Sequence, residues 1–187
     1  LTDVTGVQTC ALPISGLTAE TAWDTTQVVD GAWDLRVVIR TATGATVAES
    51  TRFIVVNNAV EWHGGPLATS EIWTPGRVHV VNHDLTIPSG LVLTLDPGTI
   101  VKFLPGIRLT IQSGGVLNAL GEELDPCVLT SFLDDSQGGD SNLDGDLSKP
   151  TPGSWRLSLS TGATIESNDH TRFRYNSRTY GGTLAAS

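Results

Sequence analysis

The densest group of residues that could do chemistry is an acidic stretch, DDSQGGDSNLDGDLSKP, at residues 134–150. Five aspartates fall within 13 residues of it. Alternate side chains at Asp140, Asn142 and Asp144 can converge on one hard cation, and Gly145 permits the sharp turn that follows. The next residue would add its backbone carbonyl. The pattern predicts a Ca²⁺ site formed by Asp140, Asn142, Asp144 and Asp146.

This loop departs from a complete EF-hand. Thr151 stands at the twelfth position, where that motif has a bidentate glutamate, and no helical period flanks the segment. Asp134 and Asp135 are further candidate ligands. Carboxylates this close together repel one another unless solvent or a cation separates them. Two interpretations stay open: a weak calcium site, which we favour, and a solvated acidic loop.

Histidine and cysteine offer less. His79 and His83 in HVVNH lie four residues apart, on one face of a strand. A zinc site would need a third and a fourth ligand, which the local spacing does not supply. Cys127 alternates with Leu129, so we predict a buried thiol that behaves as a small apolar side chain.

Charge and hydropathy exclude two classes of partner. The chain has 20 acidic and 11 basic residues and a net charge of −9, so its surface would repel phosphate backbones. We therefore predict no nucleic-acid partner. No long apolar run occurs, so we predict no membrane insertion.

An internal repeat indicates which elements position the acidic loop. LTIPSGLVL begins at Leu85 and LTIQSGGVL at Leu109, with seven of nine residues identical at a spacing of 24. Short strand-like runs lie between PSG, DPG, LPG and QSGG corners. This arithmetic predicts the coils of a β-helix, with Leu85 stacked on Leu109 and Ile87 stacked on Ile111.

The same region has a family resemblance. Residues 60–175 carry LTIPSGLVLTLDPGTIVKF, then GVLNALGEELDPCVLTSF, an acidic loop and PGSW, in that order. They resemble the opening coils of right-handed parallel β-helix proteins of the bacterial cell surface. Cys127 and Arg156 depart from the pattern, which has an aliphatic residue and a glycine there. The resemblance implies that residues 59–187 are the N-terminal coils of a truncated β-helix.

A second resemblance covers residues 16–58. AWDTTQVVDGAWDLRVVIRTATGATVAESTRFIVVNN resembles the last strands of a bacterial immunoglobulin-like or fibronectin-like domain. The alternating strand from Trp33 to Ile39 and the turn centred on Gly44 predict a hairpin. About half a sandwich is present, so we predict that this part is marginally stable by itself. We expect Trp62 and Trp73, which follow it, to cover the end of the next core; the alternative is a platform on which sugar rings stack.

The first residues raise a different question. VTGVQTCALPI, at residues 4–14, resembles the conceptual translation of a short-read sequencing adapter. That resemblance implies that residues 1–15 are an assembly artefact; the alternative is a natural N-terminal strand. No Lys or Arg precedes residue 36, so a signal peptide is not predicted within this chain.

Two functions are compatible with this organisation. The first, which we favour, is a non-catalytic structural or adhesive module of a secreted or cell-surface bacterial protein, with a polysaccharide or a surface protein as partner. The alternative is a polysaccharide lyase or glycoside hydrolase of the β-helix type whose catalytic coils lie elsewhere. Such an enzyme needs paired carboxylates, or a basic residue with calcium, in a groove of several coils. No catalytic residue is predicted in this chain.

Overall fold

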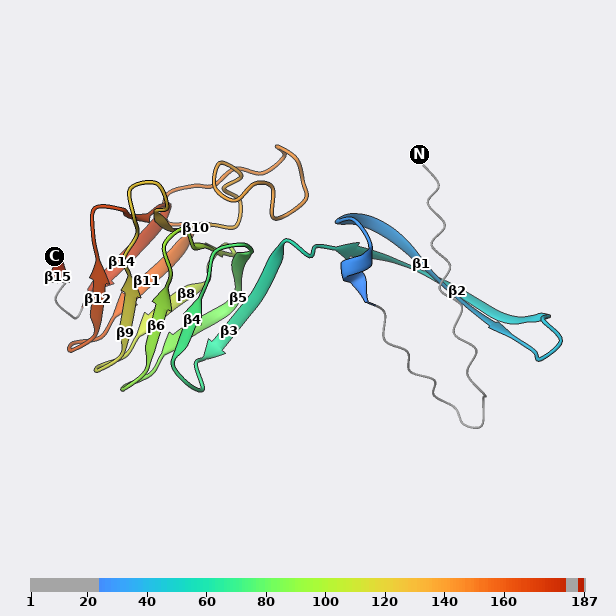
Figure 1. Cartoon of the computed structure of the whole chain (residues 1–187), viewed down its shortest axis with the longest axis horizontal. Helices are drawn as coiled ribbons and strands as arrows, with labels where there is room; N and C mark the ends of the chain where they lie inside the picture. Colours follow the sequence, from blue (N-terminus) through green and yellow to red (C-terminus); the bar gives the residue numbers. More distant parts are fainter. Residues whose placement is uncertain (1–23, 181–184, 187) are drawn as a thin grey trace.

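The computed structural model describes residues 24–180 and 185–186 (Figure 1). The predicted adapter-derived segment, residues 1–15, lies outside the described residues. The described part is all-β, as predicted, with a single 3₁₀ turn. Its elements are η1 (Thr25–Gln27), β1 (Gly31–Arg40), β2 (Thr46–Val56), β3 (Val60–Pro66), β4 (Glu71–Trp73), β5 (Val78–Ile87), β6 (Val92–Leu95), β7 (Ile100–Phe103), β8 (Arg108–Ile111), β9 (Val116–Ala119), β10 (Cys127–Ser131), β11 (Trp155–Leu159), β12 (Thr164–Ser167), β13 (Thr171–Phe173), β14 (Asn176–Tyr180) and β15 (Ala185–Ala186).

Parallel pairing dominates the architecture. The strands β1 and β2 form an antiparallel hairpin, and all the other strands pair in parallel. One sheet has the order β13-β10-β7-β5-β8-β11-β14, with β3 also paired to β5, and the other has the order β15-β12-β9-β6-β4. The long strand β5 turns a corner, because its first half pairs with β7 and its second half with β8.

The chain passes through three stacks of parallel strands in turn, and we call one such passage a coil. Three successive coils are β5 (second half)-β6-β7, β8-β9-β10 and β11-β12-β13. Within the stacks, Leu85 pairs with Leu109, which in turn pairs with Leu157. Ile87 likewise pairs with Ile111, so the stacking predicted from the repeat is confirmed. Figure 1 shows the strands of each stack side by side.

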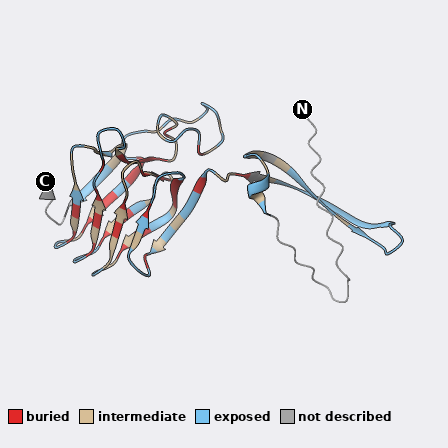
Figure 2. Ribbon diagram, in the orientation of Figure 1, coloured by how far each residue is buried: buried red, intermediate tan, exposed pale blue. Residues whose placement is uncertain are grey.

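Inward-facing side chains of these coils form one continuous core. Leucine, isoleucine and valine ladders fill it, and Figure 2 shows buried residues along every complete coil. The rings of Phe103 and Trp155 stack in its interior with centroids 4.1 Å apart. Trp73 covers the first end of the core, as predicted. The same prediction is wrong for Trp62, which is 49% exposed and packs against Phe132 outside the core.

Glycine occupies the corners where successive coils touch. The Gly90 amide donates to the Gly114 carbonyl at 2.9 Å, and the Gly114 amide donates to Gly162 at 2.8 Å. All three residues have φ between 75° and 84°, a backbone conformation that residues other than glycine rarely adopt. The PSG and QSGG motifs therefore form the repeated bend that keeps the coils in register.

The hairpin β1–β2 contrasts with the coils. Its turn has Gly44 at φ 85°, as the sequence predicted, and Arg36 pairs with Glu49 through two hydrogen bonds of 2.7 Å. Phe53 and Val37 are more than half exposed, and Figure 2 shows most of the hairpin in the exposed colour. A second sheet would bury these side chains, so the assignment to half of an immunoglobulin-like sandwich stays a prediction.

The register of the core predicts the effect of a single charge. Leu109 is 1% exposed and lies between two other leucines, so Leu109→Asp buries a carboxylate without a partner. We expect this variant to lose roughly 4 kcal/mol or more of unfolding free energy in urea titrations followed by circular dichroism. Thr110→Asp, one residue further and directed outward, is the matched control and should lose about 1 kcal/mol or less. Equal losses in the two variants would contradict this packing.

Candidate metal centre

The acidic loop leaves the coils at one corner. In the preceding coil the chain crosses from β7 to β8 within residues 104–107, whereas the next crossing, from β10 to β11, takes residues 132–154. This longer segment covers the outer face of β5 and β7. There Phe132 packs with Val80 and Ile100 in a small apolar cluster that is separate from the main core.

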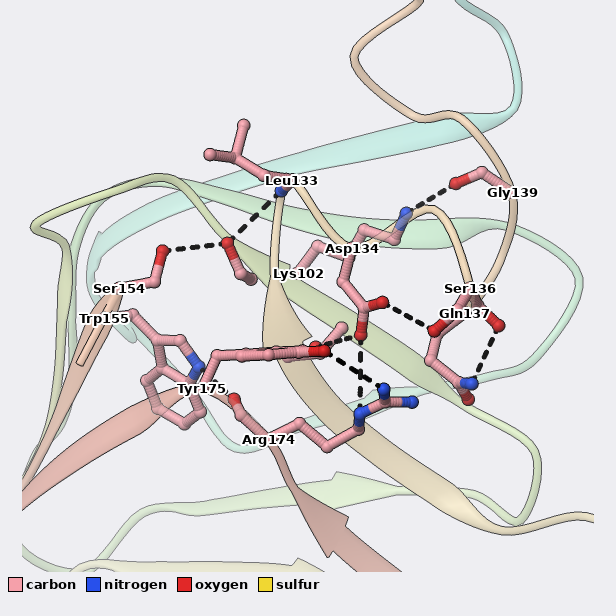
Figure 3. A network of polar contacts seen from close by, with 12 residues as sticks. Lys102, Leu133, Asp134, Ser136, Gln137, Gly139, Ser154, Trp155, Arg174 and Tyr175 are labelled. Carbon is pink, nitrogen blue, oxygen red and sulfur yellow. Dashed lines mark hydrogen bonds and ion pairs between the residues drawn. The ribbon is translucent and has the colours of Figure 1, made fainter. Parts of the chain in front are cut away.

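A buried lysine lies beneath the loop. Lys102, on β7, is 0% exposed, and its Nζ donates to the Gly139 carbonyl at 2.6 Å (Figure 3). Burial lowers the pKa of Lys102, while the charges of Asp135, Asp134 and Asp140 act to raise it. The ammonium therefore provides a positive charge on the strand that faces the acidic loop.

Asp134 anchors the start of the loop. Its carboxylate accepts hydrogen bonds of 2.6 Å from Thr130 and Ser136 and lies 3.5 Å from the Arg174 Nε (Figure 3). Burial acts to raise the pKa of this carboxyl, but these hydrogen bonds and the charge of Arg174 outweigh it and lower the pKa. Asp134 thus has its partners within the protein and is an anchor rather than an exposed ligand.

Three other carboxylates converge further along the loop. Carboxylate oxygens of Asp135, Asp140 and Asp144 lie within 4.8 Å of one another. The Asp140 carboxylate accepts from the backbone amides of Asp144 at 3.2 Å and Gly145 at 2.8 Å, which closes the turn. One oxygen of Asp144 accepts from Asn142 Nδ2 at 2.8 Å and from the Ser148 hydroxyl.

Four oxygens of this cluster are buried and accept no hydrogen bond from the described part of the chain. They are both carboxylate oxygens of Asp135, Oδ1 of Asn142 and Oδ1 of Asp144. Burial raises the pKa of Asp135, and the negative charges of Asp140 and Asp144 add to that rise. Buried acceptors without a donor are costly, so this arrangement is one that a cation would stabilise.

The structure thus brings together most of the predicted ligands. Asp140, Asn142 and Asp144 lie in one cluster, and Asp135 joins them. The side chain of Asp146 points elsewhere, since it is exposed and pairs with Lys149. Its expected role, through the backbone carbonyl, stays a prediction.

Sequence reasoning missed the role of Lys102. Its signal was a lysine inside TIVKF, a run that otherwise reads as a buried strand, in a chain with only two lysines.

The cysteine and histidine candidates had different outcomes. Cys127 is fully buried with its Sγ near the Asp96 carbonyl, as predicted. His79 and His83, predicted to share one face of a strand, differ in environment: His79 is buried and contacts His63, whereas His83 is exposed and contacts Asn82.

Comparisons with models of protein families, with curated proteins and with solved structures found no match. In the described residues there is also no helix of the length and hydropathy that crossing a membrane requires.

The two lysines provide a test of the loop's anchoring. Lys102→Met keeps the volume of the side chain but removes the ammonium that holds the Gly139 carbonyl and faces Asp135. We expect a loss of roughly 1.5–3 kcal/mol in unfolding free energy without added metal. Lys149→Met, in an exposed ion pair, is the control and should leave the urea midpoint nearly unchanged. A Lys102→Met protein as stable as wild type would refute the anchoring role.

Proposed function

We propose that this chain is a non-catalytic structural or adhesive module of a secreted bacterial surface protein, and that its acidic loop binds Ca²⁺. The convergence of Asp135, Asp140, Asn142 and Asp144 carries the proposal, together with four buried oxygens to which no described residue donates a hydrogen bond. The resemblance of residues 60–175 to cell-surface β-helix proteins supplies the class. The enzyme alternative stays a prediction that no contact among the described residues tests.

The proposed fold is a right-handed parallel β-helix. Parallel stacks visited in turn, with leucine on leucine at each coil, support a β-helix. A connection between parallel strands of one sheet is right-handed in nearly all proteins, because of the twist of the strands. The right-handed sense of the coils is therefore part of the proposal.

Calcium fits the chemistry of the loop better than a transition metal. All the converging groups are carboxylate or amide oxygens, which hard cations prefer. The loop is also irregular, and Ca²⁺ accepts flexible geometry with six to eight oxygen ligands, whereas Mg²⁺ demands an octahedron. Leu143, between Asn142 and Asp144, has φ 58°, so the backbone bends sharply between two proposed ligands.

The proposed location is consistent with a weak site. Extracellular calcium modules have dissociation constants on the order of 10⁻⁴–10⁻³ M, and calcium affinity falls as the negative charge of the site falls. Lys102 reduces the net negative charge and hence the affinity, and it anchors the loop at the Gly139 carbonyl whether or not the ion is bound.

Removal of calcium tests the proposal. We expect saturating Ca²⁺, at about 100 times the dissociation constant, to raise the melting temperature by about 5–10 °C relative to EDTA. Asp144→Asn removes a converging carboxylate and should abolish most of this shift. Asp146→Asn is the matched control, because that side chain pairs with Lys149 outside the cluster, and it should keep the shift. Equal melting temperatures of the wild-type chain in Ca²⁺ and EDTA would refute the site.

A groove next to the loop supports a polysaccharide as partner. It has a volume of about 510 Å³ and contains the exposed Trp62 beside Phe132, with ring centroids 5.9 Å apart. Asn57 and Asn58 line it with amide groups. Aromatic faces with neighbouring amides suit sugar rings, which have apolar faces and hydroxyl edges.

Replacement of the tryptophan tests this partner. Trp62→Ala should weaken retention in gels that contain bacterial polysaccharides by about two- to tenfold, whereas Trp62→Phe keeps a ring and should lose less. Ile72→Ala, on the exposed face of β4, is the control and should migrate like the wild-type chain. Retention that is unchanged in Trp62→Ala would exclude this groove as the sugar site.

A further inference from the structure

A second group of side chains that could bind a metal lies outside the acidic loop, and two of its three members are histidines. Glu61 and His63 come from β3, two residues apart, so they face the same side of that strand. Glu61 is the register partner of His79 on β5. Parallel pairing thus brings three side chains together at the first end of the stacked core.

Hydrogen bonds fix the orientation of the buried imidazole. His79 is 3% exposed, and its Nε2 lies 2.9 Å from the Thr74 carbonyl. A carbonyl can only accept, so Nε2 carries the proton and Nδ1 presents its lone pair. That lone pair accepts a hydrogen bond from His63 Nε2–H at 2.9 Å, and a bound metal would take the place of this shared proton. A histidine whose other nitrogen donates to a backbone carbonyl has the arrangement that holds a metal ligand in place.

The separations suit a shared metal. His63 Nε2 lies 2.9 Å and Glu61 Oε2 lies 3.9 Å from His79 Nδ1. One ligand atom from each residue falls within 4.8 Å of the others. Tetrahedral zinc with bonds near 2.0–2.1 Å separates its ligand atoms by about 3.3 Å, so small side-chain rotations bring the three to that spacing.

Aromatic packing makes a rigid wall behind the pair. The Trp73 ring stacks on His63 at 3.9 Å and on His79 at 5.0 Å, measured between ring centroids. The Trp73 indole donates to Glu71 at 2.8 Å. Burial and the neighbouring His79 lower the pKa of His63, although Glu61 and Glu71 act to raise it. Neutral imidazole is the form that ligates a metal.

We propose that Glu61, His63 and His79 bind a divalent transition metal, of which Zn²⁺ is the best fit, with a fourth position open to water. Two imidazoles and one carboxylate form a ligand set that zinc prefers and calcium does not. Because the Glu61 side chain is about half exposed, the ion would be reachable from solvent. It would link β3 to β5. The ion would thereby hold the first strand of the stacks against the strand in which the next coil begins.

Calorimetric titration of the full chain with Zn²⁺, in saturating Ca²⁺ to fill the acidic loop, tests this site. The expected result is one Zn²⁺ per chain. Glu61→Gln and His63→Gln change partly exposed side chains and should weaken zinc binding by about tenfold or more. His83→Gln, on the same strand but bonded to Asn82, is the control and should bind like the wild-type chain.

The possible results distinguish a zinc site from a pair of histidines that only covers the end of the core. If the two histidines only close the end of the core, the wild-type chain binds no zinc, and the proposal is overturned. Equal weakening in His83→Gln would overturn it as well. Near-ultraviolet circular dichroism of each variant confirms that the Trp73 environment persists, so that lost binding reflects lost ligands. Asp144→Asn should leave zinc binding unchanged, which keeps this test independent of the calcium site.

Discussion

The stacking of like residues in successive coils is the constraint on which the rest of the structure depends. Leu85, Leu109 and Leu157 lie in one parallel register, and a shift of one residue would turn every one of them outward. Neighbouring parallel strands lie about 4.8 Å apart, so the buried side chains of each coil pack directly on those of the coil before it. The glycine corners preserve this register because they allow the same bend in each coil.

That constraint also explains where a functional loop can form. A coil can release additional residues only at a corner, provided that the next strand resumes the register. Residues 132–154 do so between β10 and β11, and Arg156 still pairs with Arg108 across the insertion. Lys102 and Asp134 then attach the loop to the outer face. The carboxylates of Asp135, Asp140 and Asp144 stay grouped, and several oxygens of this cluster accept no hydrogen bond from the described residues.

Much of the stacked region could be predicted from sequence because the repeat is local. Identical residues at a spacing of 24 indicate the strands, the corners and the pairing of Leu85 with Leu109. The ligand cluster was only partly predictable, since alternation suggests Asp140, Asn142 and Asp144 but says nothing about Asp135, which the loop folds back to meet. Contacts such as His63 with His79 depend on pairing between strands, and no spacing along the chain encodes them.

Amide hydrogen exchange tests in one experiment whether a stack of strands held in one register carries a calcium-binding loop. In Ca²⁺, amides from β5 to β13 should exchange as one protected unit, and the Asp144 and Gly145 amides, which donate to Asp140, should share that protection. In EDTA the stack should stay protected while those two amides exchange quickly. The same exchange rate for the two amides in Ca²⁺ and EDTA, or separate unfolding of neighbouring coils, would contradict the account.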